Sequence, residues 1–167
     1  TRFYARRIAQ NCRKLGINVN FAPSVDVNVN PDCPIIGKLG RSFSADATVV
    51  ARNARWFADE HARQGVLCAI KHFPGHGSSV SDTHLGIADV TDTWTDSELA
   101  PYKSLLQYTL QIAVMSSHIF NRKIDSVYPA TLSQSIMSML RNDLGYNGII
   151  FSDDMMMNAI SKYYGLE

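Results

Sequence analysis

The chain has 167 residues, of which 46% are hydrophobic and 19% are charged, a composition that excludes an intrinsically disordered protein. Its formal net charge of +1 provides no strong positive field to hold a polyanion, so a nucleic-acid partner is not expected. The three cysteines are too few and too widely spaced for a disulfide framework or a Cys-x-x-Cys zinc site, and no apolar run approaches the roughly 18 residues of a membrane-spanning helix.

The first part of the chain predicts a helix, a strand and a long loop. Residues 1–15 carry apolar side chains at the helical period and end at Gly16, which is typical of a helix C-cap. Residues 17–25 alternate apolar residues with asparagine before they reach Pro23, as expected of a strand that runs into a loop. Residues 28–41 contain two prolines and two glycines and are expected to form a long loop.

Helical and buried-strand patterns alternate along the rest of the chain. The helices are expected over residues 45–64, 95–110 and 132–144, and the strands over residues 66–73, 112–119 and 148–153. We interpret Thr95 and Glu98 as a capping box that opens the middle helix. Asp154 is interpreted as the N-cap of a last helix that begins among residues 155–157.

This alternation predicts an α/β fold with a parallel sheet built from about four β-loop-α units. Polar and ionisable residues collect just after each predicted strand. Active sites of barrels and of doubly wound sheets lie at that end, because the loops after parallel strands converge there. The pattern alone does not distinguish a barrel from an open sheet.

A dense cluster of ionisable side chains follows the second predicted strand. The segment 71–84 contains three imidazoles, one amine and one carboxylate. One interpretation is a polar loop whose histidines have structural roles. A second is a zinc site, for which the available ligands are His72, His76, Asp82 and His84. The Pro-Gly turn between the first two of these excludes the helical i, i+4 spacing of a zincin helix.

A third interpretation of the same cluster is proton transfer. In an extended segment, Asp82 and His84 would lie on one side of the backbone, close enough to form a hydrogen bond. Histidine titrates near neutrality, with a reference pKa of ~6.5, and a nearby carboxylate can fix its tautomer and stabilise its charged form. The two residues would form an acid/base unit, which still lacks a nucleophile.

The last predicted strand supplies two candidate nucleophiles, Asp153 and Asp154. Adjacent residues of a strand point to opposite faces, so both cannot enter the same site. Both could instead cap the next helix, since a helix N-terminus favours carboxylates. That interpretation suits Asp154 better than Asp153, which leaves Asp153 as the candidate for chemistry.

Several short motifs follow one another over nearly the whole chain. The string KHFPGHG at residues 71–77 is followed, four residues later, by DTH at residues 82–84. The others are NFAP at residues 20–23, followed by Asp26-Val27, GRSF at residues 40–43, and FSDD at residues 151–154. In identity and order these motifs resemble the β-N-acetylglucosaminidase branch of family 3 glycoside hydrolases.

The resemblance implies a retaining β-N-acetylhexosaminidase. The first Asp of the SDD motif, here Asp153, would attack the anomeric carbon, and His84, steered by Asp82, would protonate the departing oxygen. Water activated by His84 would then hydrolyse the covalent glycosyl-enzyme with retained configuration. No metal or organic cofactor is required by this mechanism.

The resemblance also implies a set of substrate-binding residues. Arg41, Lys71 and His72 match positions that hold the hydroxyl groups of the sugar ring. For Arg41, an ion pair that pins the long loop is an alternative interpretation. For Asp26 we prefer a structural role, and His118, at the end of its strand, is a candidate for the wall of the site.

The implied fold is a (β/α)8 barrel, of which residues 1–167 would form a single, partial domain. A four-strand piece would expose two sheet edges and an open core, so we expect the remaining strands in a longer protein. Alternative functions are a β-glucosidase or a glycoside phosphorylase of the same family, or an inactive fragment that acts as a sugar-binding scaffold. The expected partner is a glycan or muropeptide that contains N-acetylglucosamine, in the cytoplasm or periplasm of a bacterium.

Overall fold

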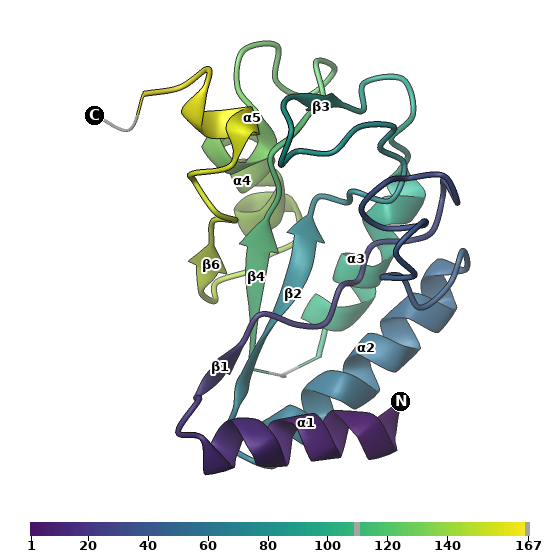
Figure 1. Ribbon diagram of the computed structural model, residues 1–167, viewed down its shortest axis with the longest axis vertical. Helices are drawn as coiled ribbons and strands as arrows, with labels where there is room; N and C mark the ends of the chain where they lie inside the picture. The colour runs from purple at the N-terminus through teal and green to yellow at the C-terminus, as the bar shows by residue number, and fades with distance from the viewer. Residues whose placement is uncertain (109–110, 166–167) are drawn as a thin grey trace.

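A parallel sheet forms the centre of the fold (Figure 1). The computed structural model describes residues 1–108 and 111–165. Its four-stranded sheet has the order β1-β2-β4-β6, with β1 (Val19–Asn20), β2 (Leu67–Phe73), β4 (Ile112–Ser116) and β6 (Ile150–Phe151). Every neighbouring pair of these strands is parallel. A small parallel sheet of β3 (Ala88–Asp89) and β5 (Ile119–Phe120) lies beyond the carboxyl end of the main sheet.

The order of the strands decides between the two fold classes that the sequence pattern left open. The strands follow one another in the main sheet in the same order as in the chain. A doubly wound sheet reverses direction at a switch point, whereas a (β/α) barrel adds each strand beside the preceding one. The sheet is therefore singly wound, as predicted for one part of a barrel wall.

The sheet is also strongly curved. Phe21 directly follows β1 and Phe151 belongs to β6, so the two residues stand at opposite edges of the sheet. Their ring centroids are nevertheless only 5.0 Å apart. In a flat sheet, three strand spacings of about 4.8 Å would separate the edges by roughly 14 Å. The two rings thus meet across a concave face, which is the interior side of a barrel wall.

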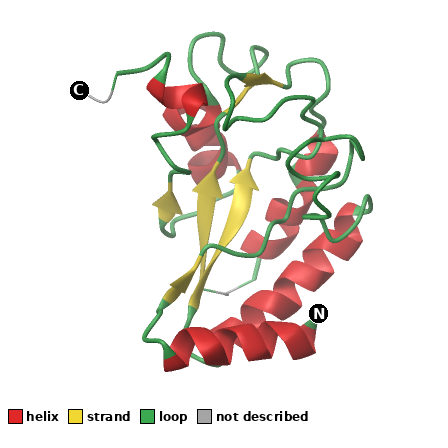
Figure 2. Cartoon of the chain, in the orientation of Figure 1, coloured by secondary structure: helices red, strands yellow, loops and turns green. Residues whose placement is uncertain are grey.

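Helices of unequal length accompany the sheet (Figure 2). The long ones are α1 (Arg2–Lys14), α2 (Ala47–Ala62) and α3 (Ala100–Leu106); α1 packs on α2, and α2 packs on both α3 and β2. The shorter helical segments are η1 (Asp96–Glu98), η2 (Ala130–Leu132), α4 (Gln134–Ser138), the π-helical η3 (Met139–Asp143) and α5 (Asn158–Ser161). No helix in the described ranges combines the length and apolar character needed to cross a bilayer.

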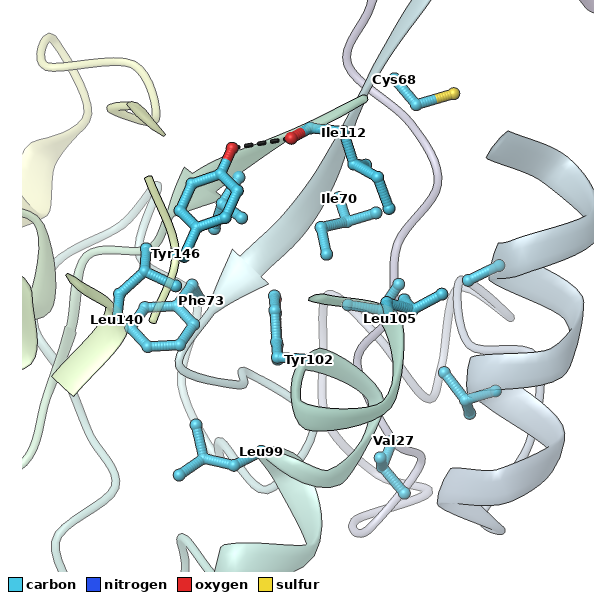
Figure 3. Packing of buried hydrophobic residues seen from close by; sticks show 14 of the residues in the cluster. Val27, Cys68, Ile70, Phe73, Leu99, Tyr102, Leu105, Ile112, Leu140 and Tyr146 are labelled. Carbon is cyan, nitrogen blue, oxygen red and sulfur yellow. Dashed lines mark hydrogen bonds between the residues drawn. The ribbon is translucent and has the colours of Figure 1, made fainter. Parts of the chain in front are cut away.

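The hydrophobic core lies between β2, β4 and the helices (Figure 3). Ile70 and Phe73 of β2 and Tyr102 and Leu105 of α3 are all buried. The Phe73 and Tyr102 rings meet edge to face, with centroids 5.1 Å apart. Burial of one such side chain stabilises the folded state by about 1.5–3 kcal/mol, so this layer fixes α3 against the strand that leads into the candidate site.

The predicted middle helix begins differently from the expectation. Residues 96–98 form a 3₁₀ turn before α3, and residues 109–110, the predicted end, lie outside the described ranges. The capping-box interpretation is wrong, because Thr95 Oγ1 contacts Ser97 Oγ and the Glu98 side chain turns inward and is fully buried. Glu98 instead binds the loop that follows β2, a partner far away in the sequence.

The last elements are shorter than predicted. The strand expected over residues 148–153 is confined to Ile150–Phe151, and the last helix begins at Asn158 instead of among residues 155–157. Asp154 Oδ1 accepts a hydrogen bond from the backbone N–H of Met156 (2.8 Å), so it caps the turn before the helix. The predicted helix 132–144 is likewise split into 3₁₀, α and π segments.

Candidate active site

The predicted site residues come from different strands but lie at one end of the sheet. Lys71 and His72 belong to the end of β2, His118 follows β4, and Asp153 follows β6. These strands are parallel, so their carboxyl ends point the same way, toward the long loops at the top of Figure 1. The loop that carries Asp82 and His84 leaves β2 at the same end. The fold thus gathers segments that are remote in the sequence.

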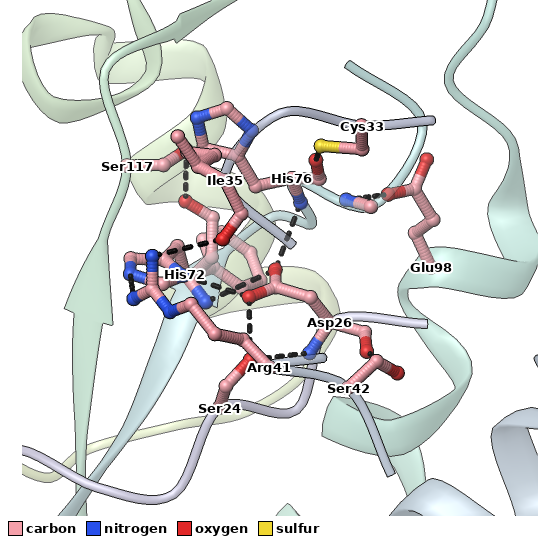
Figure 4. Close-up of polar contacts among 12 residues, drawn as sticks. Ser24, Asp26, Cys33, Ile35, Arg41, Ser42, His72, His76, Glu98 and Ser117 are labelled. Carbon is pink, nitrogen blue, oxygen red and sulfur yellow. Dashed lines mark hydrogen bonds and ion pairs between the residues drawn. The ribbon is translucent and has the colours of Figure 1, made fainter. Parts of the chain in front are cut away.

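Asp26 is the centre of a buried hydrogen-bond network at this end (Figure 4). Its side chain is inaccessible to solvent. Oδ2 accepts hydrogen bonds from His72 Nδ1 (2.7 Å) and Ser24 Oγ (2.8 Å), and Oδ1 accepts from the backbone N–H groups of His72 (3.2 Å) and His76 (2.9 Å). Burial by itself would raise the pKa of Asp26, but these partners, His72 above all, hold the pKa well below its usual value. The network supports the structural role predicted for Asp26.

The hydrogen bonds of His72 fix its tautomer and connect it to Arg41. His72 Nδ1 donates to Asp26, so Nε2 is left to accept a hydrogen bond from Arg41 Nη2 (3.3 Å). Arg41 Nη1 donates to the backbone oxygen of Ile35 (3.0 Å). None of the ion pairs within the described ranges involves Arg41, so the ion-pair interpretation is wrong. Arg41 holds the long loop through a carbonyl group and lies beside His72, and the sugar subsite of these two residues stays a prediction.

Lys71 lies next to His72 and senses the charge of Asp153. Partial burial and the charge of Arg41 lower the pKa of Lys71, whereas the carboxylates of Asp153 and Asp26 raise it. Lys71 therefore lies near enough to Asp153 for their charges to interact. The roles of Asp153 as nucleophile and of Lys71 as a group that binds the sugar stay predictions.

His118 supports the segment that carries Asp153 instead of forming an exposed wall. The residue is only 1% exposed. Its Nε2 donates to the backbone oxygen of Asp154 (2.9 Å), and its Nδ1 lies 2.9 Å from Thr131 Oγ1. Burial lowers the pKa of His118, which favours the neutral ring. The prediction of a wall residue is corrected because both ring nitrogens are used within the protein.

Asp82 and His84 form the predicted hydrogen bond, although by a different backbone geometry. Asp82 Oδ1 accepts from His84 Nδ1 (2.7 Å) and also from the backbone N–H of His84 (2.8 Å). Residues 83–85 form a turn, so the pair is closed by the turn and not by extended alternation. Burial would raise the pKa of Asp82, but its hydrogen bonds with His84 outweigh burial and lower it. The His84 side chain is 59% exposed, which leaves its ring accessible to a substrate.

Thr83 holds this pair against the body of the protein. Thr83 is 1% exposed, and its Oγ1 lies 3.4 Å from His76 Nε2. Its backbone oxygen accepts from the N–H of Ala159 in α5 (3.2 Å). Burial lowers the pKa of His76 to about 4, which keeps this ring neutral at physiological pH. In this turn the side chains of Asp82 and His84 therefore lie toward solvent, and buried Thr83 binds the turn to the rest of the protein.

Glu98 is a residue near the site that the sequence pattern assigned to another role. Its Oε2 accepts hydrogen bonds from the backbone N–H groups of Gly77 (2.8 Å) and Ser78 (3.2 Å). Burial raises the pKa of Glu98 to about 7, and its hydrogen bonds with Ser78 and Gly77 only partly oppose this shift. The only sequence signal was a glutamate before an apolar helix, which is also the signal of a capping box.

The side chains considered as zinc ligands do not converge. His72 is bound to Asp26, whereas His84 is bound to Asp82 on the exposed turn. Across residues 1–108 and 111–165, no group of three or more His, Cys, Asp or Glu side chains could hold a metal ion. The arrangement can instead supply an exposed imidazole with a fixed orientation, and a carboxylate that follows β6 at the same end of the sheet.

Comparison with known proteins gives the family. Residues 3–167 match the model of the glycosyl hydrolase family 3 N-terminal domain. The chain is 37% identical over 175 residues to Beta-hexosaminidase A of Pseudoalteromonas piscicida, covering 96% of this chain and 29% of that protein. It also resembles the solved structure of a glycoside hydrolase family 3 β-N-acetylglucosaminidase from Paenibacillus sp. str. FPU-7, with a TM-score of 0.90 and 39% identity over 96% of this chain and 31% of the other.

A second solved structure matches with similar coverage. Zinc-bound CbsA from Thermotoga neapolitana matches with a TM-score of 0.88 and 31% identity, covering 97% of this chain and 35% of that one. The chain thus spans only 29–35% of the lengths of these three relatives. The match of the family model over nearly all of the sequence shows that the chain belongs to glycosyl hydrolase family 3 and corresponds to its N-terminal domain.

Proposed function

We propose that the protein is a retaining β-N-acetylhexosaminidase that releases terminal β-linked N-acetylglucosamine. One observation carries the proposal: an exposed imidazole, His84, is hydrogen-bonded to Asp82 (2.7 Å) on a loop at the end of the sheet where Asp153 follows β6. A retaining glycosidase needs a nucleophile and an acid/base that changes role between its two steps. Asp153 and His84 can supply these functions.

In the first step, the Asp153 carboxylate attacks the anomeric carbon while His84 donates a proton to the departing oxygen. The C1–O bond to the leaving group breaks, and an ester bond between C1 and Asp153 forms. In the second step, His84 takes a proton from water, the water oxygen bonds to C1, and Asp153 departs as a carboxylate. Two inversions at C1 leave the configuration unchanged.

The hydrogen bond to Asp82 suits His84 for both steps. Because Nδ1 is held by the carboxylate, Nε2 is the nitrogen available to give and take the proton. The same hydrogen bond fixes the orientation of the ring for both transfers. Asp82 is thus proposed to orient His84, in the same way as the carboxylate of a catalytic triad orients its histidine.

Binding of the sugar is assigned to Arg41, Lys71 and His72. The Arg41 guanidinium has five N–H donors, of which the structure uses two, on Ile35 and His72. The remaining donors and the Lys71 ammonium group can bind hydroxyl oxygens beside Asp153. The choice of N-acetylglucosamine is supported by the names of the related proteins, a hexosaminidase and an N-acetylglucosaminidase.

Trapping of the covalent intermediate tests the nucleophile. The full-length protein is incubated with a 5-fluoro-N-acetylglucosaminyl fluoride, digested and analysed by mass spectrometry, and the added mass is expected on Asp153. Asp153→Asn should abolish labelling, and the matched variant Asp154→Asn should retain it. A label on any other residue would remove Asp153 from its assigned role.

Relative activity on three chromogenic substrates tests the specificity. We expect the N-acetyl-β-glucosaminide to be cleaved much faster than the β-glucoside or the β-xyloside. A preference for the glucoside would defeat the assignment of the sugar and would favour the β-glucosidase alternative. Undiminished activity in excess chelator is expected as well, and loss of activity that zinc restores would favour a metal-dependent mechanism.

Phosphorolysis is a second candidate for the second step. A neutral imidazole repels an incoming phosphate less than the carboxylate that serves as acid/base in most glycosidases. Reaction in phosphate buffer, with the product analysed by ³¹P NMR, separates the two outcomes. A sugar 1-phosphate would identify a phosphorylase, and free N-acetylglucosamine would identify a hydrolase.

A further inference from the structure

The loop that carries Asp82 and His84 has an anchored first part, residues 77–79, which we call its root, and a tip, residues 80–85, with several exposed side chains. At the root, Asn30 donates to the oxygens of Gly77 (3.0 Å, from its backbone N–H) and Ser79 (3.1 Å, from Nδ2). At the tip, Val80 and Leu85 are 65% and 74% exposed. The tip therefore depends on the root, and on the contacts of Thr83, for its position.

Glu98 holds this root from below by the two hydrogen bonds from Gly77 and Ser78. The loop also packs tightly against Glu98 and Val27. A Cβ atom added to Gly75, whose φ is +127°, would lie 2.5 Å from Glu98 Cβ. A Cβ atom added to Gly77 would lie 1.7 Å from the backbone oxygen of Val27. Gly77 is thus enclosed between Val27 and the Glu98 carboxylate, with room for backbone alone.

The charge of Glu98 is costly for a purely structural contact. Its side chain is 0% exposed, and among the ion pairs of the described residues none includes Glu98. Its second oxygen, Oε1, is buried without a hydrogen-bond partner in the described structure. Removing a carboxylate from water without a counterion is unfavourable, and well-packed apolar residues often stabilise a protein better than buried charges do. In return, the carboxylate supplies a strong hydrogen-bond acceptor for two consecutive backbone N–H groups.

We propose that Glu98 is a positioning residue for the acid/base: by accepting hydrogen bonds from Gly77 and Ser78, its carboxylate fixes the root of the loop and so sets the place of His84 relative to Asp153. The proposal rests on the function proposed above. Glu98 does not touch the substrate in this arrangement. It acts only through the backbone that leads, within a few residues, to the Asp82–His84 pair.

Activity with two leaving groups tests the proposal in the full-length protein. Glu98→Ala is expected to lower kcat at least tenfold on an N-acetylglucosamine disaccharide, whose leaving oxygen needs a proton, with KM changed less than threefold. On the dinitrophenyl glycoside, whose leaving group needs no proton, the loss of the glycosylation rate is expected to be several times smaller. Positioned proton transfer contributes about 10²–10⁴-fold to such rates, so a tenfold loss represents partial misplacement.

Glu60→Ala is the matched control. Glu60 is also a buried glutamate (1% exposed), but it lies in α2 and pairs with arginines, including Arg6 at 2.8 Å. Its replacement removes a buried carboxylate whose ion pairs, with Arg2, Arg6 and Arg63, do not involve the loop. Any loss in this control should be the same for both leaving groups. An equal loss for both leaving groups in Glu98→Ala as well would overturn the proposal.

Hydrogen–deuterium exchange gives a readout that does not depend on activity. Glu98→Ala should increase deuterium uptake in peptides that cover residues 76–85, and Glu60→Ala should not. Glu98→Gln keeps an acceptor oxygen and should restore both the protection and most of the rate. If Glu98→Ala does not fold, Glu98→Asp, which withdraws the carboxylate by one methylene, takes its place with the same expectations.

The two proposals fail in different ways. A wild-type protein without glycosidase activity, but with exchange in the loop that responds to Glu98→Ala, would refute the proposed function and leave the anchoring intact. An active wild-type protein in which the Glu98 variants show neither increased exchange nor dependence on the leaving group would refute the positioning role alone.

Discussion

Asp26→Asn should be strongly destabilising, because the donors around Asp26 cannot all be satisfied by an amide. Asn can keep an oxygen toward the backbone N–H groups of His72 and His76, but its NH₂ group would then face His72 Nδ1–H and the Ser24 hydroxyl. His72 could move its proton to Nε2. That change would place the proton against Arg41 Nη2, which can only donate. Two donors would then face each other at His72 Nε2 instead of at His72 Nδ1.

The expected magnitude follows from these contacts. Breaking a buried charged pair by removing one partner costs about 3–5 kcal/mol, and a single unsatisfied buried donor costs about 1–3 kcal/mol. We therefore expect the free energy of unfolding at pH 7 to fall by about 3 kcal/mol or more. The matched control is Asp89→Asn, since Asp89 pairs with Arg122 at the surface (3.1 Å, side chain 39% exposed). An exposed pair of this kind contributes about 0–1 kcal/mol.

The pH dependence provides an independent check on the same residue. The folded-state pKa of Asp26 lies below its unfolded value, so its stabilisation is present above pH ~4 and is lost as the pH falls toward the folded pKa. Urea titrations of wild type and variant at pH 7 and pH 3 would measure this. The difference between the two proteins should shrink at the lower pH. A difference below 1 kcal/mol at pH 7, similar to that of Asp89→Asn, would refute the assignment of Asp26 as the centre of the network.

Three further predictions concern the surroundings of the site. Gly75→Ala should lower the melting temperature in a thermal scan, because a φ of +127° and a 2.5 Å approach to Glu98 Cβ leave no room for a methyl group; unchanged melting would contradict the tight packing. Glu98→Gln should change the pH dependence of unfolding, because a pKa raised to about 7 means that the wild type loses stability as the pH rises from 4.5 to 7, by at most about 1.4 kcal/mol per pH unit. Parallel curves for the two proteins would exclude this titration. His118→Ala should lower kcat about 10- to 100-fold, because the backbone of Asp154 loses its hydrogen-bond donor (2.9 Å) and Asp153 is displaced; steady-state kinetics measure this, and a purely KM effect would argue against it.

Sequence patterns determined the features that depend on neighbouring residues. The helical period of apolar side chains predicted α1 and α2, and apolar runs predicted β2 and β4. In α1 and at its C-cap, the large apolar side chains of Phe3 and Leu15 are nevertheless exposed, and the buried residues of the helix are Ala5 and Ala9. The Asp82–His84 hydrogen bond was also foreseen, since the two residues are only two positions apart, although a turn and not a strand closes it. The motifs were specific enough to predict the family that the comparisons show.

Only the tertiary structure decided features that depend on distant residues. The contact between the rings of Phe21 and Phe151 reveals the curvature of the sheet, which no local pattern encodes. The bond between Asp26 and His72 joins residues 46 positions apart, and Glu98 meets Gly77 across 21 positions. In the sequence, a glutamate before a helix looks the same whether it caps that helix or binds a distant loop. Which of the two it binds is fixed by the packing of α3 against β2, which buries its carboxylate beneath the loop.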